Sequence, residues 1–158
     1  MFPIPWYVAL FESVPENILL IILGFKLFNI DVSLKQTVVI ACVAASVSYY
    51  LRLEMVPFGI HTLIGIALLT LMSSLLFRLD FTHCLVSVLT GFLILGVFSI
   101  VLVAGWQEIT STSVDDLSKK PWLCIAYFVP VGVIMVTIYH YVRKYSLVVF
   151  DLTLTRDS

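Results

Sequence analysis

Charged residues are scarce in this sequence of 158 residues, of which Asp, Glu, Lys and Arg make up only 12%. They nearly balance, with a formal net charge of −1, so the chain lacks the basic surplus that binds nucleic acid. Cysteine occurs three times, without the close spacing of a zinc or redox site, and we expect Cys42, Cys84 and Cys124 to be packing residues. No catalytic triad, metal-ligand set or phosphate-binding loop can be assembled. The sequence therefore predicts no enzyme, no metal and no cofactor.

Hydrophobic residues are abundant instead. They make up 61% of the sequence, and its mean hydropathy is +1.09. Soluble domains are apolar in only about half of their residues, so this composition indicates an integral membrane protein surrounded by the lipid bilayer. The first ten residues, MFPIPWYVAL, lack the basic segment and small-residue cleavage site of a signal peptide. We expect them to remain in the mature protein.

Five apolar stretches are long enough to cross a bilayer, whose hydrocarbon core needs about 20 mostly apolar residues per helix. They are residues 6–28, 34–50, 58–77, 84–106 and 122–141. Residues 1–142 are therefore predicted to form an all-α domain, a polytopic bundle of five transmembrane helices. Residues 143–158, which alternate apolar and polar side chains, are predicted to be a short cytoplasmic tail or the start of a linker.

Lysine and arginine are unevenly divided between the two ends of such a bundle. One end and its tail carry six of them, Lys26, Lys35, Arg78, Arg143, Lys144 and Arg156, and the other end carries three, Arg52, Lys119 and Lys120. The positive-inside rule predicts that the basic end is cytoplasmic. The chain is thus predicted to be a multi-pass protein of the cell membrane, with its N-terminus outside and its C-terminus in the cytoplasm.

Small residues and proline indicate how the helices pack. In the second span, Ala41 and Ala45 are four residues apart, as are Ala44 and Ser48, and such pairs permit close approach of helices. We expect this helix at the centre of the bundle. In the fifth span, Pro130 removes a backbone hydrogen bond and is predicted to form a structural hinge.

The segment ESVPENILLI places Glu12 and Glu16 one helical turn apart, and therefore on one face of the first span. If Trp6 marks the outer interface, these acids lie roughly 9 and 15 Å below it. Ionisable groups at that depth usually face the interior of a bundle or a cavity. The alternative is a helix that begins near Val14, with Pro15 in its first turn and the acids at the interface.

Partners for the two acids are available in the connection between the second and third spans. Arg52 could neutralise one carboxylate through a forked hydrogen bond, and His61 could share a proton with the other. Glu12, Glu16, Arg52 and His61 are therefore predicted to form an outward-facing polar cluster that binds a ligand. The alternative is that these groups only pair with one another and fix the register of three helix ends.

Three segments, ESVPENILLIILGFKLF, SYYLR and PFGIHTL, resemble the N-terminal membrane region of Gram-positive bacterial sensor histidine kinases whose cytoplasmic part carries a GHKL-type ATPase domain. In that group an E-S-[IV]-P-E motif opens the first helix, and an L-[IV]-R…P-[FL]-G-[IV]-H-T pattern joins the second and third. The matching positions are residues 12–16, Leu51, Arg52 and residues 57–62. Since the sequence holds no ATP-binding or phosphoacceptor region, the resemblance implies a sensing or anchoring module of a two-component system.

Three classes of function follow. The leading hypothesis is signal transduction, in which the bundle passes a membrane or extracellular signal to a cytoplasmic partner of the histidine-kinase type. The second is a small transporter with a proton or cation site at the acids, and the third is a structural subunit or assembly factor of a membrane complex. A second copy of the chain is a further candidate partner.

Overall fold

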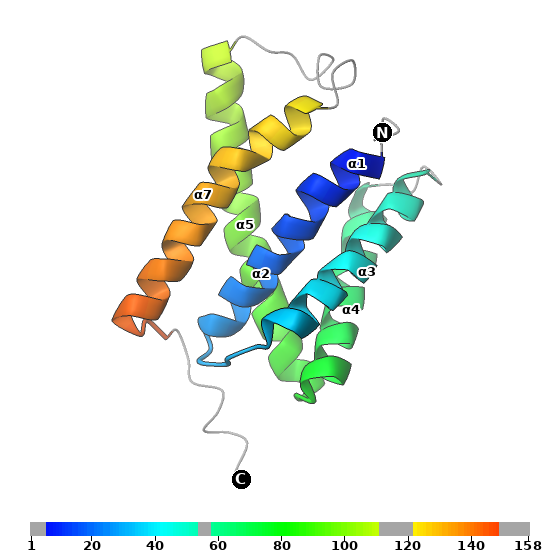
Figure 1. Cartoon of the computed structure of the whole chain (residues 1–158), viewed down its shortest axis with the longest axis vertical. Coiled ribbons are helices and arrows are strands. Elements are labelled where there is room, and N and C mark those ends of the chain that lie inside the picture. The colour runs from blue at the N-terminus through cyan, green and yellow to red at the C-terminus, as the bar shows by residue number, and fades with distance from the viewer. Residues whose placement is uncertain (1–5, 54–57, 111–121, 149–158) are drawn as a thin grey trace.

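The computed structural model describes residues 6–53, 58–110 and 122–148, and every element in these ranges is a helix (Figure 1). The all-α class is thus confirmed. The elements are α1 (Trp6–Val8), the π-helix η1 (Ala9–Ser13), α2 (Val14–Lys26), α3 (Leu34–Leu53), α4 (Phe58–Phe77), α5 (Phe81–Thr110) and α7 (Trp122–Tyr145). Ser113 and Asp116, whose spacing is that of a capping box and predicts a single helical turn, lie outside the described residues.

The apolar stretches of the sequence predicted the helices well. The helix α4 has the predicted bounds, whereas α5 and α7 continue to Thr110 and Tyr145, a few residues beyond them. Within the part of the chain that the structure describes, three helical segments are long and apolar enough to cross a membrane: Leu34–Leu51, Gly59–Phe77 and Phe81–Leu102.

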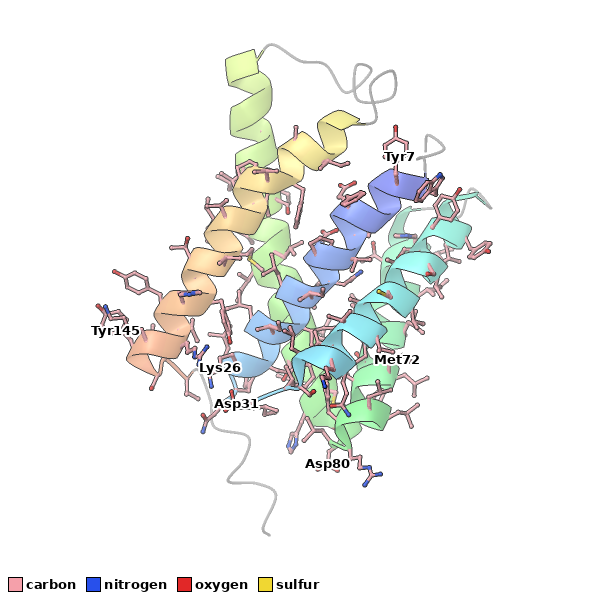
Figure 2. The ribbon with its side chains drawn as sticks, viewed as in Figure 1. Tyr7, Lys26, Asp31, Met72, Asp80 and Tyr145 are labelled. Carbon is pink, nitrogen blue, oxygen red and sulfur yellow. The ribbon has the colours of Figure 1, made fainter. Side chains whose placement is uncertain are left out.

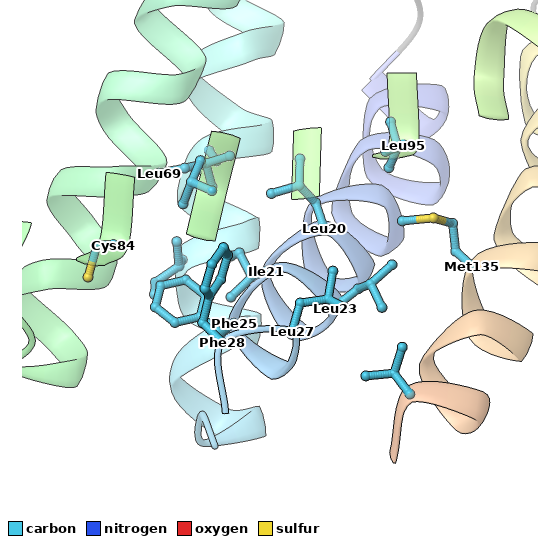
Figure 3. Packing of buried hydrophobic residues seen from close by; sticks show 14 of the residues in the cluster. Leu20, Ile21, Leu23, Phe25, Leu27, Phe28, Leu69, Cys84, Leu95 and Met135 are labelled. Atoms are coloured by element: carbon cyan, nitrogen blue, oxygen red, sulfur yellow. The ribbon is translucent and has the colours of Figure 1, made fainter. Parts of the chain in front are cut away.

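The central helix is α2, which packs against α3, α5 and α7 (Figure 1). The prediction that the second span is central was wrong, because α3 packs mainly on α2 and α4. The helix α2 buries its own side chains on several sides: Leu20, Ile21, Leu23 and Phe25 are at most 2% exposed (Figure 3). The small residues of α3 do pack closely, since Ala41, Ala44 and Ala45 are also buried, but they serve one side of the bundle.

Three helices end in the same way at one end of the bundle. After α2, α4 and α7, a residue with positive φ reverses the chain: Asn29 (61°), Arg78 (55°) and Ser146 (48°). After Asn29 and Ser146, the next backbone N–H donates a hydrogen bond of 3.1 Å to the carbonyl oxygen five residues earlier. These bonds run from Ile30 to Phe25 and from Leu147 to Val142. This pattern satisfies carbonyl groups that the last helical turn leaves open.

The same end of the bundle gathers basic residues. Lys26 at the end of α2 forms a 2.6 Å ion pair with Asp31, and Figure 2 shows both near the end of α7, which is marked by Tyr145. Lys35 lies in the first turn of α3, Arg78 follows α4, and Arg143 and Lys144 lie in the last turn of α7. Tyr7 marks the opposite end (Figure 2). The helical topology therefore brings the sequence-predicted basic loops together.

Candidate functional site

The first helix changes its geometry at the acidic motif. The sequence predicted a helix from Trp6, which is confirmed, but residues 9–13 form a π-helix, whose wider turns have i→i+5 hydrogen bonds. Pro15 follows this segment and has no N–H to give to the carbonyl of Phe11, which favours the wider turn. Regular α-helix then begins at Val14. The widened turn therefore includes Glu12 and Ser13.

Asn17 bridges the junction between η1 and α2. Its side-chain nitrogen Nδ2 donates a hydrogen bond of 2.8 Å to the carbonyl oxygen of Ser13, and Ser13 itself is 5% exposed. The amide keeps its second N–H as a donor and its Oδ1 atom as an acceptor. The bond fixes the side chain of Asn17 on the face of α2 that also carries Glu16 and Leu20.

A cavity of about 170 Å³ lies against this face, enclosed by α2, α3, α4 and α5. Its walls are Ser13, Glu16, Asn17 and Leu20 of the first helix, Ser48 of α3, His61, Thr62, Gly65 and Leu69 of α4, and Phe92 of α5. Polar side chains from three helices therefore converge inside the bundle. A concave site with a few convergent polar groups is the usual form of a small-molecule site.

The cavity is polar at one end and apolar at the other. His61 and Thr62 lie in the first turns of α4, and Leu69 lies two turns further along, a rise of about 12 Å. On α2, Leu20 follows Glu16 by one turn. Leu20 and Leu69 are 2% and 3% exposed. The polar end therefore faces the end of the bundle that Tyr7 marks (Figure 2), and the apolar end lies at its core.

The structure brings together two of the four predicted cluster residues, since Glu16 and His61 line the same cavity. Glu12 lies one turn earlier, half-buried, with its Oε2 atom shielded from solvent. Glu12, Glu16 and His61 each have an interaction partner. Arg52 lies in the last turn of α3, but its side chain is outside the described residues. Its pairing with a carboxylate remains a prediction.

Several cavity residues were not predicted from the sequence. Asn17 and Thr62 directly follow Glu16 and His61, so the segments that contain them were recognised but their own roles were not. Ser48 had been assigned to helix packing only. Phe92 lies within a long apolar run and carries no signal that separates it from its neighbours.

Another side of α2 contacts α7. A groove between these helices is lined by Phe11 and Leu19 on one side and by Ile125, Phe128, Val129, Gly132, Val133, Val136 and Thr137 on the other. A Cβ atom placed on Gly132 would lie 4.0 Å from the Leu19 side chain. The predicted hinge residue Pro130 lies within α7, two residues before Gly132. The helix α2 thus has the cavity on one face and the region of Pro130 on another.

The cavity walls offer carboxylate, amide, hydroxyl and imidazole groups for hydrogen bonding. In residues 6–53, 58–110 and 122–148, no group of three or more His, Cys, Asp or Glu side chains is arranged to hold a metal ion. Comparison with protein-family models, with curated proteins and with solved structures finds no match for this chain.

Proposed function

We propose that this chain is a membrane-embedded sensory module that binds a small ligand in the cavity beside Glu16 and His61 and passes the signal to a cytoplasmic partner of the histidine-kinase type. The observation that carries the proposal is the cavity itself, with polar walls from α2, α3 and α4. Polar groups inside a membrane bundle usually mark a functional site, because each must be desolvated. The resemblance to the membrane region of GHKL-type sensor kinases supports the same class.

In this proposal five helices span the membrane. Besides the three helices that are long and apolar enough to cross a membrane, these are the continuous helical stretch of residues 6–26 and α7. The first rises about 30 Å, the thickness of a bilayer core. It packs centrally between helices that are themselves apolar enough to cross the membrane. The basic end, with Lys26, Lys35 and Arg143, is cytoplasmic by the positive-inside rule, and the cavity opens toward the outside.

The output of the module leaves through α7, which leads toward the cytoplasmic end of the chain. A ligand shifts such an element only through its different affinity for two states. Leu19 of α2 and Gly132 of α7 line the same groove, and this supports the route. Leu19 lies one helical turn from Glu16, and Gly132 lies two residues from Pro130. A small movement of α2 is therefore transmitted to the part of α7 where the proline has removed a backbone hydrogen bond.

Gly65 offers a direct test of the cavity. A Cβ atom at this position would meet nothing within 4 Å, and Gly65 lines the cavity, so Gly65→Leu adds an apolar side chain at the cavity wall. The experiment uses the variant Ser48→Cys in a background without Cys42, Cys84 and Cys124. Intact cells that carry it are treated with a small membrane-impermeant thiol reagent. We expect labelling of Ser48→Cys, and loss of labelling when Gly65→Leu is added.

Gly96→Leu is the matched control, because Gly96 also has open space at its Cβ but does not line the cavity. It should leave labelling of Ser48→Cys unchanged. If Ser48→Cys resists the reagent, or if Gly65→Leu and Gly96→Leu behave alike, the cavity is not an outward-facing binding site and the proposal is wrong.

Transport is the second candidate, favoured by three hydroxyl groups deeper in the bundle. Thr70 and Ser73 of α4 and Ser87 of α5 are fully buried, and their hydroxyls have no hydrogen-bond partner among the described residues. Internal water commonly satisfies such groups and would extend the polar path beyond the cavity. Proton flux into liposomes that contain the purified chain, lost with Glu16→Gln and with Ser73→Ala, would favour this function over sensing.

A further inference from the structure

We infer that the groove between α2 and α7 binds an anionic phospholipid, with one acyl chain in the groove and the phosphate group at Arg143 and Lys144 of α7. Binding of this lipid requires that α2 and α7 lie in the bilayer, as in the proposed function, but it does not require a ligand in the cavity beside Glu16. The two helices supply an apolar wall, an opening toward the surrounding lipid and a basic end.

The groove has the form of a site for a hydrocarbon chain. Its volume is about 480 Å³, and its lining residues on α7 recur at helical spacing from Ile125 to Thr137. Gly132 is buried, whereas Val129 and Val133 are 56% and 61% exposed. The Thr137 hydroxyl donates a hydrogen bond of 2.7 Å to the carbonyl oxygen of Val133, so it is satisfied beside an apolar neighbour. The groove is therefore closed at Gly132 and open toward the outside of the bundle, where lipid lies.

The face of α7 that lines the groove continues into basic residues. Residues seven apart lie on the same face of a helix, and Arg143 and Lys144 follow the groove residues Val136 and Thr137 by seven positions. Both basic side chains are exposed, and no ion pair joins either of them to another described residue. The apolar stripe thus ends at two cations that are accessible from the membrane surface.

The end of the bundle around Arg143 and Lys144 stays basic when its acids are counted. Lys26, which follows the groove residue Leu19 by seven positions, is already paired with Asp31 at 2.6 Å. Six lysines and arginines and four aspartates lie at this end in the sequence, in residues 26–35, 78–80 and 143–158. The basic surplus attracts an anion, and Arg143 and Lys144 are the pair to which the groove leads.

The depth of the groove below this pair matches one leaflet. Val133 precedes Arg143 by a rise of about 15 Å along the helix, which is half the thickness of a ~30 Å bilayer core. A chain whose phosphate group lies at Arg143 therefore reaches residues 133–137 of the groove. Residues 125–129, which line its other half, face the opposite leaflet.

Phosphate is the group that suits the basic pair. The guanidinium of Arg143 presents a fork of N–H donors that matches phosphate oxygens, and the ammonium of Lys144 adds a point charge. Basic sites between transmembrane helices at the cytoplasmic side are typical of anionic lipid headgroups. Tyr141 and Tyr145 flank the pair, with ring centroids 5.1 Å apart, and tyrosine is enriched at the level of the headgroups. An anionic phospholipid therefore fits both the basic pair and the groove.

The test uses the full chain in nanodiscs of phosphatidylcholine that hold a trace of a photoreactive lipid with a diazirine on its acyl chain. Two probes with the same chains differ only in headgroup, which is phosphatidylglycerol or phosphatidylcholine. After illumination, mass spectrometry locates the labelled residues. At residues 133–137 we expect about tenfold more labelling by phosphatidylglycerol, because two basic side chains hold its phosphate group. At residues 125–129 the two probes should label equally.

Two double variants separate a site from a general attraction to the basic end. Arg143→Gln with Lys144→Gln should abolish the preference for phosphatidylglycerol at residues 133–137. Lys35→Gln with Arg78→Gln is the matched control, because it removes two exposed positive charges from the same end but outside α7. This control should keep the tenfold preference.

A further pair of variants tests the groove itself. Gly132→Leu adds an apolar side chain between the helices and should reduce labelling of residues 133–137 by both probes. Gly96→Leu, which lies outside the groove, should not change it. Retained helical circular dichroism in each variant excludes unfolding as the cause.

Three outcomes would overturn the inference. Equal labelling of residues 133–137 by both probes would show a groove open to lipid without recognition of the headgroup. An equal loss of preference in the two double variants would show only a general attraction to the basic end. Labelling of residues 125–129 but not of 133–137 would show that another helix, such as that of a second copy, covers the groove. None of these results decides the function of the cavity, which fails separately if Ser48→Cys resists the thiol reagent.

Discussion

The backbone of Gly91 on α5 meets the backbone of Leu20 on α2 so closely that a Cβ atom added at Gly91 would lie 2.5 Å from the Leu20 carbonyl oxygen. One turn away the relation is reversed, since Gly24 of α2 packs against the backbone of Ser87 on α5. The two helices therefore contact each other through their main chains. Because Leu20 also lines the cavity, this contact holds one wall of the cavity in place.

Gly91→Ala is expected to destabilise the bundle by about 1–3 kcal/mol, because the added methyl group must push two backbones apart. Gly96→Ala on the same helix is the control. It meets no atom within 4 Å and should be neutral or slightly stabilising, since alanine favours helix over glycine. Unfolding in mixed detergent micelles measures both. Equal stability of the two variants would contradict the close contact between α2 and α5.

Removal of a buried hydroxyl is expected to change the stability of the bundle differently at Ser73 of α4 and at Thr37 of α3. Ser73 is fully buried without a hydrogen-bond partner among the described residues, so Ser73→Ala should leave stability unchanged or raise it by up to about 1 kcal/mol. Thr37 is equally buried, but its hydroxyl donates to the carbonyl oxygen of Ser33 at 3.0 Å. Thr37→Val should therefore cost about 0.5–1.5 kcal/mol. A loss at Ser73 as large as that at Thr37 would mean that a partner, such as an internal water, binds the Ser73 hydroxyl, as the transport hypothesis requires.

The orientation of the bundle is tested by single cysteines at its two ends. Gly59→Cys lies at the outer end in the proposed topology, and Lys35→Cys lies at the cytoplasmic end; both positions are exposed. In a background without native cysteines, a membrane-impermeant reagent applied to intact cells should label Gly59→Cys at once and Lys35→Cys only after the cytoplasm is opened. The reverse order would invert the topology.

The sequence predicted the helices because long apolar runs bounded by charged or turn-forming residues determine where helices begin and end. It did not predict which helix is central, because every span is apolar and several carry small residues. The spacing of Ser87 and Gly91 was the signal that α5 packs closely on α2, and it has the same small-residue form as the pairs noted in α3.

The candidate site was predicted only in part, for a physical reason. Glu16 and His61 stand out in an apolar sequence because burial of an ionisable group is costly. Asn17 and Phe92 do not stand out, because their roles depend on the relative rotation of α2 and α5. The π-helical turn at residues 9–13 also sets how the start of the first helix is rotated relative to α2, and the presence of Pro15 alone does not specify this turn.

The output of a histidine-kinase domain joined to the C-terminal end of the chain tests the central claim most directly. Autophosphorylation is compared in membranes for the wild type, Glu16→Gln, Gly65→Leu, Pro130→Ala and the control Gly96→Leu, with insertion verified for each. We predict that the first three variants change kinase output, because they alter the cavity or the element that transmits its signal, and that Gly96→Leu matches the wild type. Normal insertion with wild-type output in all four variants would contradict the sensory function and favour the structural-subunit alternative.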